Sequence, residues 1–193
     1  PNLENDLIIH VRNGDVYTSF PQALHLAHGY GQQPFCTVLS AIFHRTWDRI
    51  LVISEHQNPS NPKSGPVIAL LAHLAQASPS LSIHFLPGTF NQHLFLRLCA
   101  VNLVVPHSTI NYLNPFLPLL QRIFDPEMEV CPPYPFGYGW MDGRGGLSSS
   151  FSPPTIFTMK KKPIDWLDNW NNSDANLLKI ATAHCPPYYS CDY

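Results

Sequence analysis

The first 120 residues alternate between short apolar runs and longer segments in which apolar residues recur at helical spacing. The short runs are rich in β-branched residues and end at turn signals, which is typical of buried strands; they cover residues 6–11, 49–54, 81–86 and 102–105. The segments between and after them predict helices; these cover residues 34–43, 66–77, 90–100 and 106–120. Such alternation is typical of right-handed βαβ units. We therefore predict an α/β fold, a Rossmann-like parallel sheet with helices on both faces.

The pattern changes after residue 125. Prolines gather there, a Gly/Ser-rich stretch runs to residue 150, and no long periodicity continues. We therefore divide the chain into a Rossmann-like domain, residues 1–125, and an irregular C-terminal extension rich in Pro, Gly and aromatic residues, residues 126–193. We expect one short helix at residues 166–170. The density of aromatic residues argues against full disorder, so we expect the extension to wrap the domain or to dock on a partner.

Charge and hydropathy exclude two classes of partner. The 193 residues carry 11 Lys+Arg and 13 Asp+Glu, a formal net charge of -2. This balance does not suit a protein that binds nucleic acid by neutralising phosphates. We find no uncharged apolar stretch of about 18 residues, so we expect no membrane span in this chain.

The cysteines and histidines bear on redox state and metal binding. Cys36 and Cys99 lie in apolar segments, and we expect them to be buried free thiols. Cys131, Cys185 and Cys191 lie in proline-rich loops and are the candidates for disulfides in an oxidising compartment. The ten histidines share no ligand spacing and no CxxC pair is present, so we predict no metal site.

Candidate chemistry lies where strands end, because ligands of such sheets bind beyond the carboxyl ends of the strands. After the first strand, Arg12 offers a planar fork of donors that suits a phosphate. The alternative is an Arg–Asp pair across the turn, with His10 a buried core histidine. After the fourth strand, Ser108 and Thr109 open a helix whose free N–H groups favour anions; the alternative is an ordinary N-cap. Both features belong to one edge of the sheet, and together they suit a diphosphate.

Three segments resemble one enzyme family. Residues 9–17 resemble the His-x-Arg-Arg-Gly-Asp-Tyr signature of the fucosyltransferase superfamily, which includes the alpha-1,2-, alpha-1,6- and protein O-fucosyltransferases. Residues 30–34 resemble the Pro-containing entry to that family's next helix. Residues 98–109 resemble its last donor motif, a helix, an Asn-led strand and a Ser-Ser or Ser-Thr turn. The resemblance covers about residues 6–120.

The resemblance implies a metal-independent, inverting GT-B enzyme whose C-terminal Rossmann-like domain binds GDP-fucose as a donor substrate, with no further cofactor. Arg12 would stabilise the leaving GDP through its β-phosphate, and His10 would line the donor pocket. The donor-binding residues that follow are Arg12, Asn13, Glu55, His107, Ser108 and Thr109. The catalytic candidates are Arg12, Asp15 and His10. Asp15 and His10 are by position the candidates for the general base that deprotonates the acceptor hydroxyl, and a base from the other domain is the alternative.

The resemblance also implies partners and a compartment. The acceptor is a glycan or protein hydroxyl, the other half of the GT-B fold comes from another domain or chain, and the setting is the Golgi or ER lumen. The sequence departs from the signature at Asn13, where the family has a second arginine, and at Asn91 or Gln92, where it has an acidic residue. These departures favour a second hypothesis, a catalytically degenerate Rossmann-like domain that serves as a structural or protein-interaction subunit.

Overall fold

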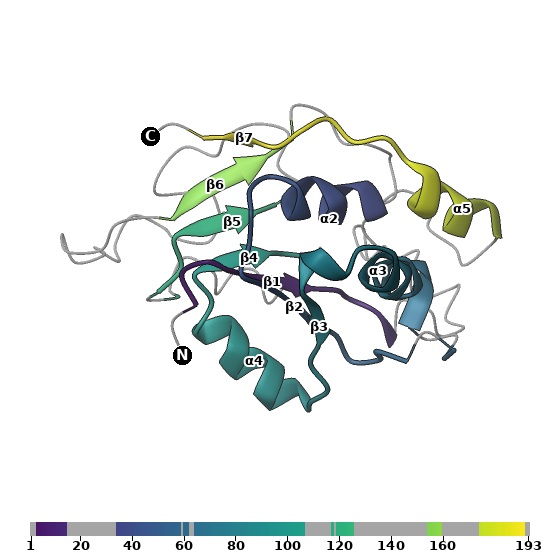
Figure 1. The fold of residues 1–193 in the computed structure, drawn as a ribbon, viewed down its shortest axis with the longest axis horizontal. Helices are drawn as coiled ribbons and strands as arrows, with labels where there is room; N and C mark the ends of the chain where they lie inside the picture. Colours follow the sequence, from purple (N-terminus) through teal and green to yellow (C-terminus); the bar gives the residue numbers. More distant parts are fainter. Residues whose placement is uncertain are drawn as a thin grey trace, which may run out of the picture.

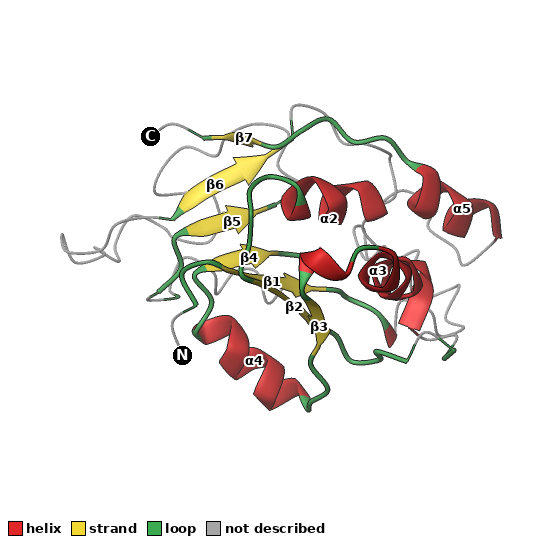
Figure 2. Cartoon of the chain, viewed as in Figure 1, coloured by secondary structure: helices red, strands yellow, loops and turns green. Residues whose placement is uncertain are grey.

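The structure of the chain is a computed structural model. It describes residues 3–14, 34–58, 60–61, 64–106, 117, 119–125, 154–159 and 174–191. These residues contain seven strands (Figures 1 and 2), namely β1 Asp6–His10, β2 Arg49–Ile53, β3 Ile83–Phe85, β4 Asn102–Val104, β5 Arg122–Phe124, β6 Thr155–Thr158 and β7 Tyr189–Ser190. They also contain the α-helices α2 Phe35–Ile42, α3 Gly65–Ala77, α4 Phe90–Leu98 and α5 Asp174–Thr182, and a short 3-10 helix, Pro79–Leu81.

All seven strands belong to one sheet in the order β3-β2-β1-β4-β5-β6-β7. Every neighbouring pair is parallel except β6 and β7, which are antiparallel. The strand order reverses between β1 and β4, which pair side by side with Ile8 opposite Leu103. This order is that of the doubly wound fold, and the reversal is its topological switch point.

The sheet has helices on both faces, as the sequence predicts. Successive side chains of a strand point to opposite faces, and β1 supplies apolar residues to both. Leu7 and Ile9 pack in a core with α2, α3 and α5, whereas Ile8 packs in a second core that includes Leu96 of α4. Figure 1 shows α4 on the opposite side of the sheet from α2 and α5. The predicted α/β, Rossmann-like class is therefore confirmed.

The predicted elements up to residue 105 correspond to β1, α2, β2, α3, β3, α4 and β4, with ends that differ by a few residues. The helix predicted over 106–120 is wrong at its end, because residues 117 and 119–120 are not helical. Its start lies outside the described residues, as does the helix predicted at 166–170. No strand was expected at β5, which follows directly and has only three residues, too few to reveal an alternating pattern.

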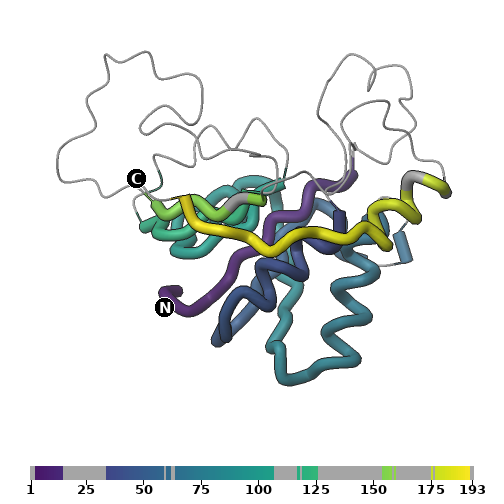
Figure 3. Tube along the Cα trace, turned by 90° about the horizontal axis from the view of Figure 1, so that it is seen from above, coloured from purple at the N-terminus to yellow at the C-terminus, as the bar shows by residue number. Residues whose placement is uncertain are grey.

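The C-terminal segment completes the same sheet. β6 pairs with β5, and β7 returns to pair with β6, with Phe157 opposite Ser190. Between these strands α5 packs against α2 and α3. In Figure 3 the yellow segment from α5 to the C-terminus crosses the width of the molecule. The described part of residues 126–193 thus wraps the domain, and the change of composition at residue 125 does not mark an edge of the sheet.

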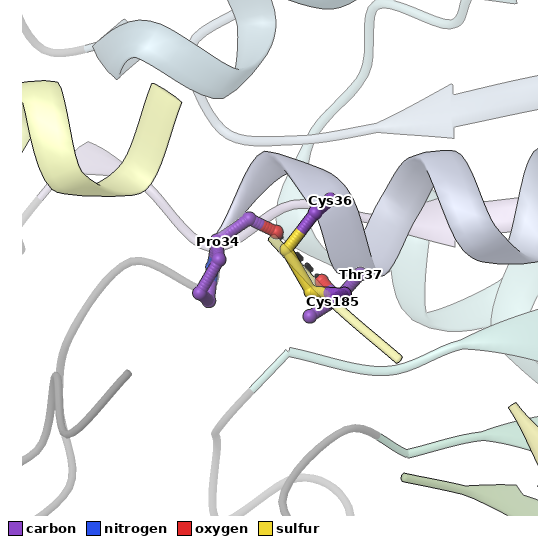
Figure 4. The surroundings of a disulfide bond; sticks show 4 residues. All are labelled: Pro34, Cys36, Thr37 and Cys185. Atoms are coloured by element: carbon purple, nitrogen blue, oxygen red, sulfur yellow. Dashed lines mark hydrogen bonds between the residues drawn. A yellow bond between two sulfur atoms is a disulfide. The ribbon is translucent and has the colours of Figure 1, made fainter. Parts of the chain in front are cut away.

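A disulfide joins this segment to α2. Cys36 and Cys185 are bonded, with their Cα atoms 5.4 Å apart, although 149 positions separate them in the sequence. Figure 4 shows the bond beside Pro34 and Thr37, where the Thr37 hydroxyl donates to the Pro34 carbonyl over 2.7 Å. The prediction that Cys36 is a free thiol is therefore wrong, because an apolar helix face accommodates a half-cystine as well as a thiol.

The other cysteines divide as follows. The expected disulfides of Cys185 and Cys191 are confirmed, whereas Cys131 lies outside the described residues. Cys99 is a free thiol, as predicted, but it is half-buried. None of the described helices has the length and apolar character needed to cross a bilayer.

Candidate functional site

The carboxyl ends of the central strands bring four loops to one edge of the sheet. β1 ends at His10, and the Val11 N–H then donates to the Ile53 carbonyl at the end of β2 over 3.0 Å. On the other side, the Val105 N–H after β4 donates to the Phe124 carbonyl of β5 over 3.1 Å. Residues 10–14 therefore lie beside the switch point, where doubly wound proteins bind ligands.

His10 faces α4 across this edge. The alternation of β1 directs His10 to the same face as Ile8, which packs with α4. There the Arg97 Nη1 donates a hydrogen bond to His10 Nδ1 over 2.5 Å. Arginine has no acceptor and stays protonated, so Nδ1 must be the acceptor. A neutral His10 therefore carries its proton on Nε2.

The surroundings keep His10 neutral. Its pKa lies well below the ordinary value of 6.5, first because burial disfavours the charged ring and then through electrostatic effects of Arg97, His93 and Arg12. A histidine with a lowered pKa is a weak proton acceptor. The structure therefore argues against His10 as the general base and favours it as a neutral hydrogen-bond donor. It also agrees with the alternative of a buried histidine whose Nδ1 is hydrogen bonded.

Helix α4 buries two basic side chains and exposes three of its apolar ones. His93 and Arg97, one helical turn apart, are buried, with Arg97 only 2% exposed, whereas Phe90, Phe95 and Leu98 are exposed. His93 Nε2 donates to the Leu86 carbonyl over 3.1 Å. This reverses the usual orientation of a surface helix and places a basic cluster between α4 and the end of β1. We define the basic cluster as His10, Arg12, His93 and Arg97.

The start of α4 is fixed by its own sequence. Thr89 and Gln92 form a capping box, in which the Thr89 N–H donates to Gln92 Oε1 over 2.7 Å and the Gln92 N–H donates to the Thr89 hydroxyl over 3.4 Å. Gln92, one of the two positions matching the family's acidic residue, is thus engaged in capping the helix.

Asn13 joins two loops. Its Nδ2 donates to the His56 carbonyl over 2.5 Å and to the Ser64 carbonyl over 3.4 Å, and its Oδ1 accepts from the His56 N–H over 3.2 Å. The side chain is 3% exposed. Both ends of the amide therefore bind the protein. In the absence of a ligand the Asn13 amide therefore connects the two loops, and its predicted contact with the donor stays a prediction.

Gly14 and Glu55 lie together beside this contact. Gly14 has a φ of +71°, and a Cβ there would stand 2.4 Å from Glu55 Oε2. Glycine is the residue that adopts this conformation without a steric cost, and it also lets Glu55 approach. The Glu55 carboxylate lies 3.9 Å from His56 Nε2, and its side chain is 70% exposed.

The structure describes some of the site residues that the sequence predicts and not others. The structure brings His10, Arg12 and Asn13 together after β1, with Glu55 on the adjacent loop. Asp15, His107, Ser108 and Thr109 lie outside the described residues. The sequence analysis did not identify His93 and Arg97 as members of this cluster. Their spacing of four residues places them on one face of the helix, and this was the one feature of the sequence that could have indicated it.

Two further observations bear on ligands. Within the described residues, no group of three or more His, Cys, Asp or Glu side chains could hold a metal ion. A cavity of about 320 Å³, lined in part by Trp47, Ser80 and Leu81, lies at the opposite edge, where β2 begins. We place the candidate site at the carboxyl edge because ligands of doubly wound sheets bind there.

Comparisons of the chain with protein-family models, with curated proteins and with solved structures give no match.

Proposed function

We propose that this chain is the nucleotide-sugar-binding part of a fucosyltransferase-like glycosyltransferase. It transfers fucose or a related sugar from a GDP-sugar to a glycan or protein hydroxyl, with inversion and without a metal. One observation carries the proposal: the segment that resembles the family's signature, His10 to Asn13, follows β1 at the switch point of a doubly wound sheet.

The charges at this edge support a diphosphate ligand. The side chains that lower the pKa of His10 are all basic, and two of them, Arg97 and Arg12, carry a permanent positive charge. Fixed cations stabilise the charge that develops on a leaving diphosphate. In the proposal Arg12 binds the β-phosphate and His10 donates through Nε2 to the donor. His107, Ser108 and Thr109 supply the remaining diphosphate contacts.

The rest of the reaction involves groups beyond this cluster. The acceptor site belongs to another domain or chain that completes the GT-B fold. The general base is Asp15 or a group of that partner, since His10 is held neutral with its proton on Nε2. The bond between Cys36 and Cys185 supports a lumenal setting, because disulfides persist in oxidising compartments.

The second candidate is a catalytically degenerate domain that serves as a protein-interaction subunit. Asn13 and Gln92, where the sequence departs from the family, are engaged in internal hydrogen bonds. Phe90 and Phe95 are 68% and 64% exposed on α4, and clustered exposed apolar side chains are a feature of interaction surfaces.

Calorimetric titration with GDP tests the first candidate, with UDP and CMP as controls, at low salt and with and without EDTA. We expect binding of GDP alone, unchanged by EDTA. The Arg12→Ala variant should bind GDP about 1.5–3 kcal/mol more weakly, the range for a hydrogen bond to a charged group, which corresponds to roughly 10- to 150-fold. Arg45→Ala is the matched control, because Arg45 is exposed and bonds Asn5.

The outcomes separate the two candidates. Equal GDP affinity of the parent and Arg12→Ala would reject Arg12 as the phosphate ligand. Absence of binding to every nucleotide would reject the donor site and favour the interaction subunit. That candidate in turn predicts that a Phe90→Ser, Phe95→Ser variant loses partner proteins that the parent retains, with its fold unchanged.

A further inference from the structure

We propose that Arg97 is a positioning residue, which holds His10 in the tautomer that presents its Nε2–H to an anionic ligand at the switch point. This inference rests on the proposed function for the identity of the ligand, a nucleoside diphosphate, but its structural part concerns the unliganded chain alone. Arg97 acts through His10 and is not assigned a contact with the donor.

The geometry gives the direction of the hydrogen bond without ambiguity. Arg97 Nη1 lies 2.5 Å from His10 Nδ1, and a guanidinium can only donate. With the lone pair of Nδ1 used, the only ring position left for the proton of a neutral imidazole is Nε2. A histidine's free nitrogen is commonly set in this way by the bond that the other nitrogen makes.

Packing alone does not explain why an arginine is buried at position 97. The side chain is 2% exposed, and taking a guanidinium out of water costs far more than burying a leucine at the same place. Leu96 and Leu98 stand on either side of it in the sequence, so apolar residues were available to α4. A buried cation that bonds a histidine next to a ligand-binding edge is instead consistent with control of that histidine.

The same arrangement opposes protonation of His10 when an anion binds. A diphosphate would attract a second proton to the ring and convert it to an imidazolium. Arg97 and His93 face the ring from α4, and Arg12 faces it from the loop after β1; all three oppose that proton. His10 therefore binds the ligand as a neutral donor, and binding takes up no proton at neutral pH.

Arg97 also accounts for the departure at position 13. The family's second arginine is Asn13 here, and its amide binds the loop at His56 and Ser64. The second guanidinium near the histidine comes instead from α4, 87 positions along the chain from His10. The motif after β1 thus has one arginine fewer than the family's signature, and Arg97 of α4 supplies a second guanidinium beside His10.

The first experiment uses the ligand-free chain of residues 1–193. Long-range proton–nitrogen NMR of the histidine rings, with His10 assigned by its loss in His10→Gln, distinguishes the two tautomers. We expect His10 to show a protonated Nε2 and an unprotonated Nδ1, and to remain neutral below pH 6.5, its ordinary pKa. A proton on Nδ1, or titration near 6.5, would overturn the proposal whether or not the chain binds GDP.

The second experiment removes the cation. In Arg97→Met, His10 should become a mixture of tautomers and titrate nearer its ordinary value. GDP affinity at neutral pH should fall about tenfold, and calorimetry in buffers of different ionisation enthalpy should now detect proton uptake on binding. Arg97→Lys, which keeps a charged donor, should restore part of the parent's behaviour, and Arg45→Met should behave as the parent.

Each outcome decides one proposal. If Arg97→Met folds and its His10 keeps the parent's tautomer and titration, Arg97 does not position His10. If that variant does not fold, the parent's NMR titration and the Lys variant decide the same point. If the NMR result is as expected but neither GDP nor inorganic pyrophosphate binds, the positioning of His10 stands and the proposed function fails.

Discussion

The Asn13 amide connects the end of β1 to the loops before α3. Its three hydrogen bonds reach His56 and Ser64, 43 and 51 positions away in the sequence. Because the side chain is buried, truncation would leave the His56 N–H and carbonyl without this partner. Leaving a buried polar group unsatisfied costs about 1–3 kcal/mol.

We therefore expect Asn13→Ala to lower the free energy of unfolding by about 1–3 kcal/mol, measured by urea denaturation. Asn5→Ala is the control, because Asn5 is exposed and its one described side-chain contact is with Arg45; its effect should be within about 0.5 kcal/mol. Equal stability of Asn13→Ala and the parent would show that the amide does not hold the two loops together.

Tyr188 gives a prediction of the opposite sign. Its ring packs edge-on against Phe124 with centroids 5.2 Å apart, and its buried hydroxyl has no hydrogen-bond partner among the residues that the structure describes. The hydroxyl thus lost its hydration on folding without replacement. Tyr188→Phe keeps the ring and should raise the free energy of unfolding by about 1 kcal/mol.

A pH series separates this effect from general packing. Burial, and then the charge of Asp125, raise the pKa of Tyr188 well above 10.0. The unfolded chain therefore loses this proton first, so the parent loses stability as pH rises above 10.0. The stability advantage of Tyr188→Phe over the parent should widen in that range. A less stable phenylalanine variant at neutral pH would mean that the hydroxyl has a favourable role.

The position of a residue at the end of an element can be predicted from the sequence, whereas its contacts with distant residues cannot. The position of His10 and Arg12 at the carboxyl edge of the sheet could be predicted because a buried strand ends there, and parallel strands present their carboxyl ends at one edge. Arg97 could not, because its partner lies 87 positions away and no local pattern records that contact. The hydrogen bonds of Asn13 to His56 and Ser64 could not be predicted for the same reason.

At the scale of elements, what the sequence predicts depends on the length of an element and on its place in the alternation. β3 and β4 have only three residues each, but each lies between two predicted helices. The five-residue strands β1 and β2 and the 13-residue helix α3 are long enough to show a run or a period. β5 has three residues and β7 has two. Their pairing depends on β4 and β6 already being in place, so neither carries a signal of its own.

Helix α4 shows that the presence of a helix and its orientation are separate questions. Thr89 and Gln92 predict where it begins, and the structure has the helix there. Its apolar residues would by themselves predict an inward face containing Phe95 and Leu98, yet these are 64% and 41% exposed. The buried side chains of α4 are instead His93 and Arg97, with Leu96 partly buried beside them, so the tertiary contacts of the two basic residues set the orientation of the helix.

At the scale of the molecule, the C-terminal segment is fastened to the sheet at several separate places. α5 packs on α2 and α3, β7 pairs with β6, and between them Cys185 bonds Cys36. The disulfide closes a loop of 149 positions. In the chain-entropy description, a cross-link over a loop of this size restricts the unfolded chain enough to stabilise the fold by about 5 kcal/mol.

We therefore expect the paired variant Cys36→Ala, Cys185→Ala to lower the free energy of unfolding by about 3–5 kcal/mol, measured by urea denaturation without reductant. The double substitution isolates this bond, whereas a reductant would also reach the disulfide of Cys191. Cys99→Ala is the control, since Cys99 is a free thiol and closes no loop.

The loss should also be unevenly distributed over the molecule. β1 and β2 are paired along five positions, and this pairing does not involve the disulfide. In the paired variant their amide protons should therefore still exchange only by global unfolding. α5 and β7 lie on either side of Cys185 and should exchange faster than the rest. Uniform exchange over the whole sheet would instead mean that the C-terminal segment and the central strands unfold as one unit, with the bond acting on the unfolded chain alone.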